Sequence, residues 1–357
     1  MVKLETVIKR SNNNFDLIRL LAALMVVFGH SFQLFRNDGY SEPVSHYFPD
    51  LNCGGLAVDI FFFLSGLFIT ASFVNSPSSR AFIIMRLFRI WPALIVCTIV
   101  TVFLVGPVVS KLTVFQYFNS KITWSYLFRN ITLQNVRFFL PGVFDANHNP
   151  RTVNGPLWTL PVEVGCYFLI FVMGIMYVFK EKWFTILIFT TLILLYALNY
   201  EQLFIYWNKP VPFFFAGSLA FILRKHIVID YKICLGLIAL IFIHYNIILL
   251  YTAIIYAVLV IGSSGIVRKI KLPADYSYGI YIYGWLTQQV LSYYIPGITS
   301  CKSLLITIPG VFLIASLSWH FIEHPFLKMG KGIVDNPPQF VMIFKHKFRL
   351  NNKKLIT

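Results

Sequence analysis

Long apolar runs alternate with short polar connections along the whole chain. The ten runs lie at about residues 15–35, 56–74, 90–109, 158–179, 183–200, 210–223, 233–246, 247–263, 276–295 and 303–322. Most are close to the ~20 residues that a helix needs to cross about 30 Å of hydrocarbon. The first run is no cleaved signal peptide, because further runs follow it and no small-residue cleavage site does. The pattern predicts an all-α, polytopic transmembrane helical bundle of about ten spans.

One boundary in this pattern is decided by charge. Residues 233–263 form a single apolar stretch that is interrupted only at His244–Asn246. One long, tilted helix here would reverse the side of every later connection and place Arg268, Lys269 and Lys271 outside. We therefore expect two short spans with a turn between them, which keeps these cations on the inner side.

Composition and charge placement support the membrane interpretation. Hydrophobic residues make up 57% of the chain and charged residues only 12%, whereas soluble domains contain about 25% charged residues. The net charge is +16, and most basic residues fall on one side of a ten-span arrangement. The positive-inside rule then places both termini in the cytoplasm. The basic excess therefore indicates topology and attraction to membrane lipids rather than nucleic-acid binding.

We expect one membrane-embedded domain, residues 1–327, and a short basic cytoplasmic tail, residues 328–357. The longest polar interruption spans residues 110–157 and contains clusters of turn-forming Asn, Asp, Pro and Gly. Two aromatic, amphipathic stretches within it, near 113–120 and 123–133, are expected at the outer membrane interface. Loops of this length are usually functional or disordered.

The first apolar run carries an arginine and a histidine on one face. Arg19 and His30 are eleven positions apart, which on a helix separates them by about 20° in direction and about 16 Å along the axis. Ionisable groups inside a membrane are rare and usually functional. A neutral histidine can act as a base, especially beside a carboxylate. The alternative is that His30 only packs through a hydrogen bond and that Arg19 extends to lipid headgroups.

Two carboxylates also lie within apolar runs. Asp59 stands beside three phenylalanines at 61–63 and is expected to face the interior of the bundle. Glu163 lies about five residues inside the fourth run, after Trp158 and one turn before Tyr167. Each carboxylate suits either the orientation of a catalytic group, the binding of a hydroxyl, or a structural ion pair.

Two arginines open the third run from the cytoplasmic side. Arg86 and Arg89 are three residues apart, so their side chains share nearly one helix face. Two planar guanidiniums at a helix mouth suit a phosphate group. Plain positive-inside anchoring is the alternative.

Two later features indicate function less specifically. Residues 275–283 place tyrosine hydroxyls, including that of Tyr281, along the ninth run. Glu323, His324 and Pro325 close the tenth run at the cytoplasmic face. His324 is expected to mark a helix boundary there rather than to act in catalysis.

Together these segments resemble the acyltransferase-3 family of integral membrane O-acyltransferases, which decorate surface glycans. The resemblance covers most of the chain and consists of six elements in order. These are Arg19 with His30, the Val58–Phe62 run, Arg86 with Arg89, Leu157–Glu163, Ser277–Tyr281 and Glu323–Pro325. The chain departs from the family at Gly284, where many members carry a histidine, so any role of that histidine is absent here.

The resemblance implies an O-acetyltransferase of a bacterial inner membrane. The acyl donor would be cytoplasmic acetyl-coenzyme A, used as a co-substrate, and no metal would be needed. The acceptor would be a hydroxyl of a surface polysaccharide or lipopolysaccharide sugar, presented as a glycan or glycolipid. By the same resemblance, Arg86 and Arg89 would hold coenzyme A phosphate, Arg19 would line the donor channel and His30 would be the catalytic histidine.

Our own inference adds helpers to this set. Glu163 and Asp59 are expected to assist catalysis, and Trp158, Tyr167 and Tyr281 to contact the substrates. His30 would remove the proton of the glycan hydroxyl, or would first accept the acyl group and pass it on. The sequence leaves these two routes, the acceptor sugar and the oligomeric state open.

Two other function classes fit a polytopic chain. A glycolipid transporter or flippase would be expected to show symmetry between its two halves, and none is detectable here. A polysaccharide polymerase would be expected to place arginines for glycan phosphate in outer loops, whereas Arg86 and Arg89 are predicted on the inner side.

Overall fold

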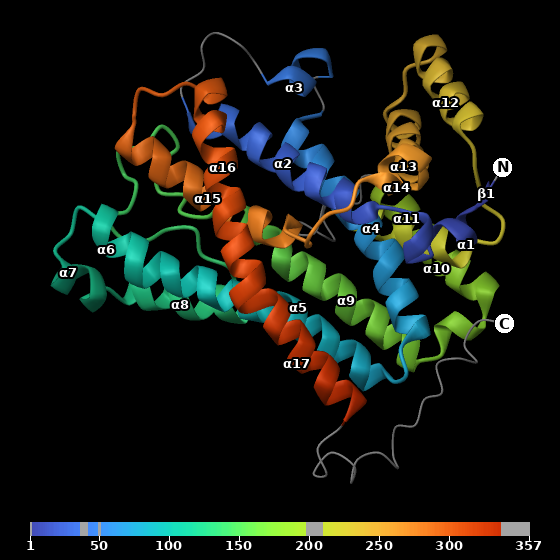
Figure 1. Cartoon of the computed structure of the whole chain (residues 1–357), viewed down its shortest axis with the longest axis horizontal. Helices are drawn as coiled ribbons and strands as arrows, with labels where there is room; N and C mark the ends of the chain where they lie inside the picture. Colours follow the sequence, from blue (N-terminus) through green and yellow to red (C-terminus); the bar gives the residue numbers. More distant parts are fainter. Residues whose placement is uncertain (1, 36–41, 49–50, 198–209, 337–357) are drawn as a thin grey trace.

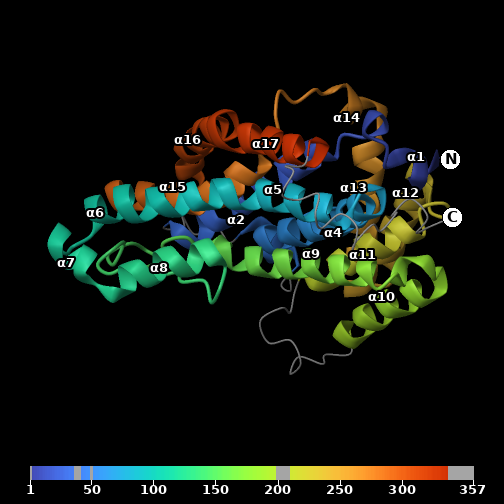
Figure 2. The ribbon, with the colours of Figure 1, turned by 90° about the horizontal axis from the view of Figure 1, so that it is seen from below.

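The structure is a computed structural model that describes residues 2–35, 42–48, 51–197 and 210–336. Helices dominate it, and within the described residues the sheet content is one pair of short strands, β1 (Val2–Lys3) with β2 (Val228–Ile229), paired antiparallel. The prediction of an all-α chain is confirmed. The longer helices lie side by side along the long axis of the molecule (Figure 1, Figure 2).

Six helices carry or pack around the candidate site residues named in the sequence analysis. They are α2 (Phe15–Leu34), α4 (Cys53–Asn75), α5 (Ser79–Val100), α9 (Thr159–Ile175), α15 (Ser277–Tyr294) and α16 (Ser300–Ser318). The remaining helices are α1 (Leu4–Val7), α3 (Pro43–Tyr47), α6 (Gly106–Val109), α7 (Val114–Asn119), α8 (Lys121–Thr132), α10 (Lys182–Ala197), α11 (Val211–Ile222), α12 (Tyr231–Ile243), α13 (Ile247–Ser263), α14 (Gly265–Lys269) and α17 (His324–Asp335).

Five of the described helical segments are long and apolar enough to cross a membrane. They are Phe15–Leu34, Cys53–Asn75, Ser79–Val109, Gly155–Ile175 and Ser300–Asp335. Shorter apolar helices occupy Lys182–Leu195, Val211–Ile222, Tyr231–Ile243 and Ile247–Ser263. The last two are separated at His244–Asn246, where the sequence predicted a turn. These segments make the chain an integral membrane protein.

The third long helix begins earlier than predicted. The Ser78 side chain accepts a hydrogen bond from the Ala81 amide and so caps the helix at Ser79 rather than near residue 90. Arg86 and Arg89 consequently lie two to three turns inside α5 and not at its mouth. The helix forms from Ser79 because its first residue is capped by Ser78, although its first turns lack a strong apolar pattern.

The last helix continues beyond its predicted end near residue 322. It passes through a π-helical turn, Trp319–Glu323, and extends as α17 to Asp335. Pro325 follows the π-helical turn directly, as the second residue of α17, and the helix continues through it. The π-helical turn, a feature that is frequent at functional sites, ends on Glu323, whose side chain is buried.

Glycines allow two close helix contacts beside the first span. A Cβ atom at Gly29 of α2 would lie 2.7 Å from the Gly54 amide nitrogen of α4. A Cβ atom at Gly284 of α15 would lie 2.8 Å from Val27 Cγ2. At Gly284, α15 therefore packs directly on α2.

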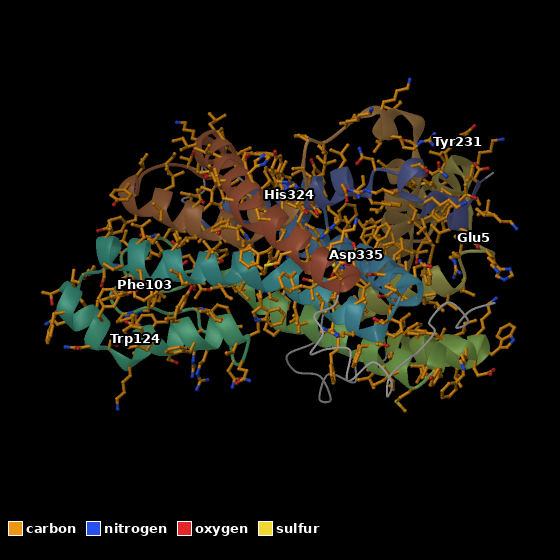
Figure 3. All side chains as sticks on the ribbon, turned by 60° about the horizontal axis from the view of Figure 1, so that its bottom comes forward. Glu5, Phe103, Trp124, Tyr231, His324 and Asp335 are labelled. Atoms are coloured by element: carbon orange, nitrogen blue, oxygen red, sulfur yellow. The ribbon has the colours of Figure 1, made fainter. Side chains whose placement is uncertain are left out.

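The polar interruption 110–157 folds back into the molecule instead of lying only at its end. α7 and α8 match the two predicted amphipathic stretches, and α8 returns alongside α5 (Figure 2). The Trp91 indole N–H of α5 donates to the Ile131 carbonyl, 3.1 Å away, at the far end of α8. Phe103, in the helical turn that follows α5, and Trp124 of α8 contact each other edge to face, with ring centroids 6.1 Å apart (Figure 3).

Candidate active site

Five helices enclose a partly open cavity with about 570 Å³ of empty space, part of which is open to the outside. The side chains that line it are polar on several sides and apolar between them. They are Arg19, Val58, Phe61, Phe62, Arg89, Ile90, Thr159, Leu160, Glu163, Tyr167, Ser277, Tyr278 and Tyr281. The cavity thus brings together residues from the first, second, third, fourth and ninth predicted runs.

A cluster of charges lies at one end of the cavity. Asp275, just before α15, accepts from Arg89 Nη2 at 2.5 Å and from Arg19 Nη1 at 3.4 Å. The other terminal nitrogen of Arg89 lies 3.5 Å from Glu323 Oε2. The Arg89 side chain is 14% exposed and that of Glu323 is 1% exposed. Arg89 therefore joins two carboxylates from different helices in a largely buried ion cluster.

Local hydrogen bonds hold both carboxylates in place. At the start of α15, the Ser277 hydroxyl and the Ser277 amide donate to Asp275 Oδ1 at 2.5 Å and 3.3 Å. The Ser318 hydroxyl donates to Glu323 Oε1 at 3.1 Å across the π-helical turn. Each carboxylate is thus oriented by its own chain segment before the arginine binds it.

The Asp275 carboxyl is expected to make stability depend on pH. Burial alone raises its pKa, but the Arg89 and Arg19 guanidiniums outweigh burial and hold the pKa below its usual value of ~3.9. Because the folded-state pKa is the lower one, this stabilisation is complete above about pH 4 and is lost as the pH falls through the folded pKa. Asp275→Asn should lower the Tm of the purified protein at neutral pH, and this difference should shrink in acid. An equal Tm at neutral pH would contradict the pairing.

Glu163 lies in the cavity wall with two hydroxyl donors. The Ser65 hydroxyl donates to its Oε1 at 3.2 Å, and the Tyr167 hydroxyl makes a very short hydrogen bond to the same oxygen. Tyr167 and Ser65 also contact each other at 3.2 Å. This arrangement keeps a carboxylate with further acceptor capacity beside the open volume.

Tyr281 closes the opposite end of the cavity. Its hydroxyl lies 2.7 Å from Thr159 Oγ1 and donates to the Pro156 carbonyl at 3.1 Å. These contacts link α15 to the 3₁₀ turn Gly155–Trp158 that precedes α9. The Phe61 ring of α4 packs edge-on against Tyr281 at 5.9 Å.

His30 lies just beyond this end. Its Nε2 faces α4, where a Cβ atom at Gly54 would be 3.9 Å away, and its ring contacts Trp285 of α15 with centroids 4.7 Å apart. Gly54 precedes Val58 by one turn, and Trp285 follows Tyr281 by one turn. His30 is thus about 5.4 Å beyond the cavity along two helices. Arg19 and His30 both contact the α15 side, as expected for two residues on one helix face.

Three other predicted residues do not line the cavity. Arg86 lies one turn before Arg89, and its Nε is buried with no hydrogen-bond partner in the described part of the chain. Asp59 is 7% exposed on α4, and the Trp158 side chain is 42% exposed. The predicted substrate contacts Tyr167 and Tyr281 do line it.

Sequence reasoning missed the acidic partners of the arginines. It treated Asp275 as the start of a tyrosine-rich run and Glu323 as a helix end. The available signal was charge balance, because arginines buried in a bundle need carboxylates close to them. Asp275 and Glu323 fall on the same predicted side of the membrane as Arg19 and Arg89.

Comparison with known proteins shows the family to which the chain belongs. Residues 12–324 match the model of a family described as an acyltransferase domain. A protein described as an O-acetyl transferase, from Shigella phage Sf6, is 30% identical over 342 residues, which cover 88% of this chain and 96% of the relative. Nodulation protein 10 of Rhizobium leguminosarum bv. viciae is 26% identical over 360 residues, 90% of this chain and 95% of that protein. No solved structure matches significantly.

Proposed function

Because the chain belongs to the acyltransferase-3 family and is an integral membrane enzyme that transfers acyl groups, we propose that it moves an acetyl group from acetyl-coenzyme A to a sugar hydroxyl of a surface glycan. The single observation that carries this proposal is the line of groups from Arg19 through the cavity to His30. The name of the phage relative supports transfer of acetyl to oxygen.

The proposed donor site is the charged end of the cavity. Both terminal nitrogens of Arg89 already contact carboxylates, so Arg89 holds the cluster together. Arg19, whose side chain is 31% exposed, and Arg86, whose Nε has no partner among the described residues, provide the contacts for coenzyme A phosphate. Together with Arg86, the cluster holds three guanidiniums against the two carboxylates of Asp275 and Glu323, so a phosphate there would meet a net positive charge.

The proposed chemistry occurs at the other end, beside His30. In direct transfer, the imidazole takes the proton of the sugar hydroxyl while the hydroxyl oxygen attacks the thioester carbonyl. The C–S bond then breaks, and the imidazolium returns the proton to the thiolate, which gives coenzyme A and the O-acetyl sugar. In relayed transfer, the imidazole nitrogen attacks the thioester carbonyl first, and the C–S bond breaks to release the coenzyme A thiolate. The sugar oxygen then takes the acyl group from the imidazole, and the hydroxyl proton passes to the thiolate. Glu163 supports either route as a hydrogen-bond acceptor in the cavity wall, and Asp59 is assigned a supporting role on α4.

The proposed topology has about ten spans, with both termini in the cytoplasm of a bacterial inner membrane. The shorter apolar helices and α15 supply the spans beyond the five long ones. In this orientation the charged end of the cavity faces the cytoplasm, and His30 lies toward the outer side. Donor and acceptor then approach from opposite sides and meet beyond Tyr281.

The test compares surface glycan from a strain that lacks this gene with glycan from its parent, by proton NMR. The proposal predicts loss of O-acetyl signals with glycan chain length and export unchanged. A flippase would instead reduce export, and a polymerase would shorten the chains. Unaltered O-acetyl signals in the deletion strain would contradict the proposed acceptor.

A further inference from the structure

The Trp285 indole is the aromatic contact of the His30 ring. The two rings meet edge to face, with centroids 4.7 Å apart and planes inclined by 80°. Trp285 is 5% exposed and packs in a small apolar cluster with Leu34 and Phe35 from the end of α2. The indole is therefore fixed in the same helix pair that carries His30.

The polar edge of the same indole is tied to the segment that precedes α9. Trp285 Nε1–H donates to the Thr152 carbonyl at 2.8 Å. A Cβ atom at Gly155 would lie 3.3 Å from the indole ring, so the backbone there packs directly on it. Gln289, one turn further along α15, also donates to the Thr152 carbonyl, at 2.7 Å. This part of the chain is thereby held against the indole that contacts His30.

In the described part of the chain, no hydrogen bond to Nδ1 fixes the His30 ring in the usual way. Catalytic histidines are normally oriented by a partner on the ring nitrogen that does not react. Here Nδ1 is buried and has no hydrogen-bond partner in the described residues. Packing must then set the ring plane, and the edge-to-face contact with Trp285 is the contact that restricts it.

We propose that Trp285 is the positioning residue of His30: its indole sets the plane of the imidazole, and its N–H bond to Thr152 holds the segment before α9 against the indole. This inference rests on the proposed function, in which His30 acts on the acceptor hydroxyl. A ring misplaced by about 1 Å loses about 10²-fold in rate, so the contact affects turnover rather than donor binding.

The experiment measures kcat and the KM for acetyl-coenzyme A on the full-length enzyme in nanodiscs. Trp285→Leu, which removes the ring, is expected to lower kcat about 10²-fold with the donor KM within about twofold. Trp285→Phe keeps an edge-to-face ring and should recover most of kcat. Trp124→Leu is the matched control, because its indole N–H also donates to a backbone carbonyl, that of Phe118 at 2.7 Å, on the peripheral helix α8. Its kcat should be unchanged.

A double-mutant cycle separates positioning from general packing. If Trp285 acts through His30, adding Trp285→Leu to His30→Ala should not lower the residual rate further. An equal additional loss in that background, or a kcat in Trp285→Leu equal to that of the unaltered enzyme, would overturn the inference while leaving the function intact. Full activity of His30→Ala itself would instead overturn the catalytic role proposed for His30, on which this inference rests.

Discussion

Replacing His30 with alanine is expected to slow acyl transfer by about 10²–10⁴-fold, the range that a positioned acid–base group contributes. The loss should appear in kcat, because the donor contacts at Arg19 and Arg86 lie at the other end of the cavity. The fold should persist. His30 Nδ1 has no hydrogen-bond partner in the described chain, so removing the imidazole does not leave a buried donor or acceptor without its Nδ1 partner. Initial rates and the Tm of the purified enzyme measure both effects.

His244 provides the matched control for this substitution. It is exposed in the turn between α12 and α13, away from the cavity-lining helices. His244→Ala should transfer acetyl groups at the unaltered rate. Transfer by His30→Ala at that same rate would refute both the direct and the relayed route.

Replacing Arg89 with methionine is expected to lower the free energy of unfolding by about 3–5 kcal/mol, the usual loss when one partner of a buried ion pair is removed. Methionine retains much of the apolar stem but leaves Glu323, at 1% exposure, without its 3.5 Å contact. Asp275 keeps only the longer contact to Arg19. Transfer should also fall sharply, because Asp275, without its contact to Arg89, no longer holds Arg19 in the correct position. Thermal unfolding followed by tryptophan fluorescence measures the change.

A substitution in the surface ion pair of Arg10 with Asp16 is the control for the loss of an arginine charge by itself. Its atoms are 3.5 Å apart, like those of Arg89 with Glu323, but the Arg10 side chain is 95% exposed. Arg10→Ala should leave the Tm unchanged, because solvent screens such pairs. If Arg89→Met proved as stable as Arg10→Ala, the buried cluster would not hold the helices together.

Local pattern predicted the helices well, because each apolar run specifies its own segment. α2 and α4 follow the predicted runs within a few residues, and the turn at His244–Asn246 was placed from the polar break in the apolar stretch together with charge. The shared face of Arg19 and His30 also followed from helix geometry.

Contacts between distant segments could not be predicted in the same way. The pairing of Arg89 with Asp275 joins residues 186 positions apart, and no local pattern encodes such a pair. The return of α8 along α5 depends on how Trp91 meets Ile131, which an amphipathic pattern does not specify. The start of α5 depended on the Ser78 cap, a signal that was present in the sequence but was outweighed by hydropathy.

The central claim is that an acyl group passes from a cytoplasmic donor, through the cavity and past His30, to an acceptor on the other side. Sealed membrane vesicles of the two orientations, given radiolabelled acetyl-coenzyme A in the external medium, test it most directly. Inverted vesicles, which expose the cytoplasmic face, should label the glycan, whereas right-side-out vesicles and inverted vesicles carrying His30→Ala should not. Equal labelling in right-side-out vesicles would contradict the account.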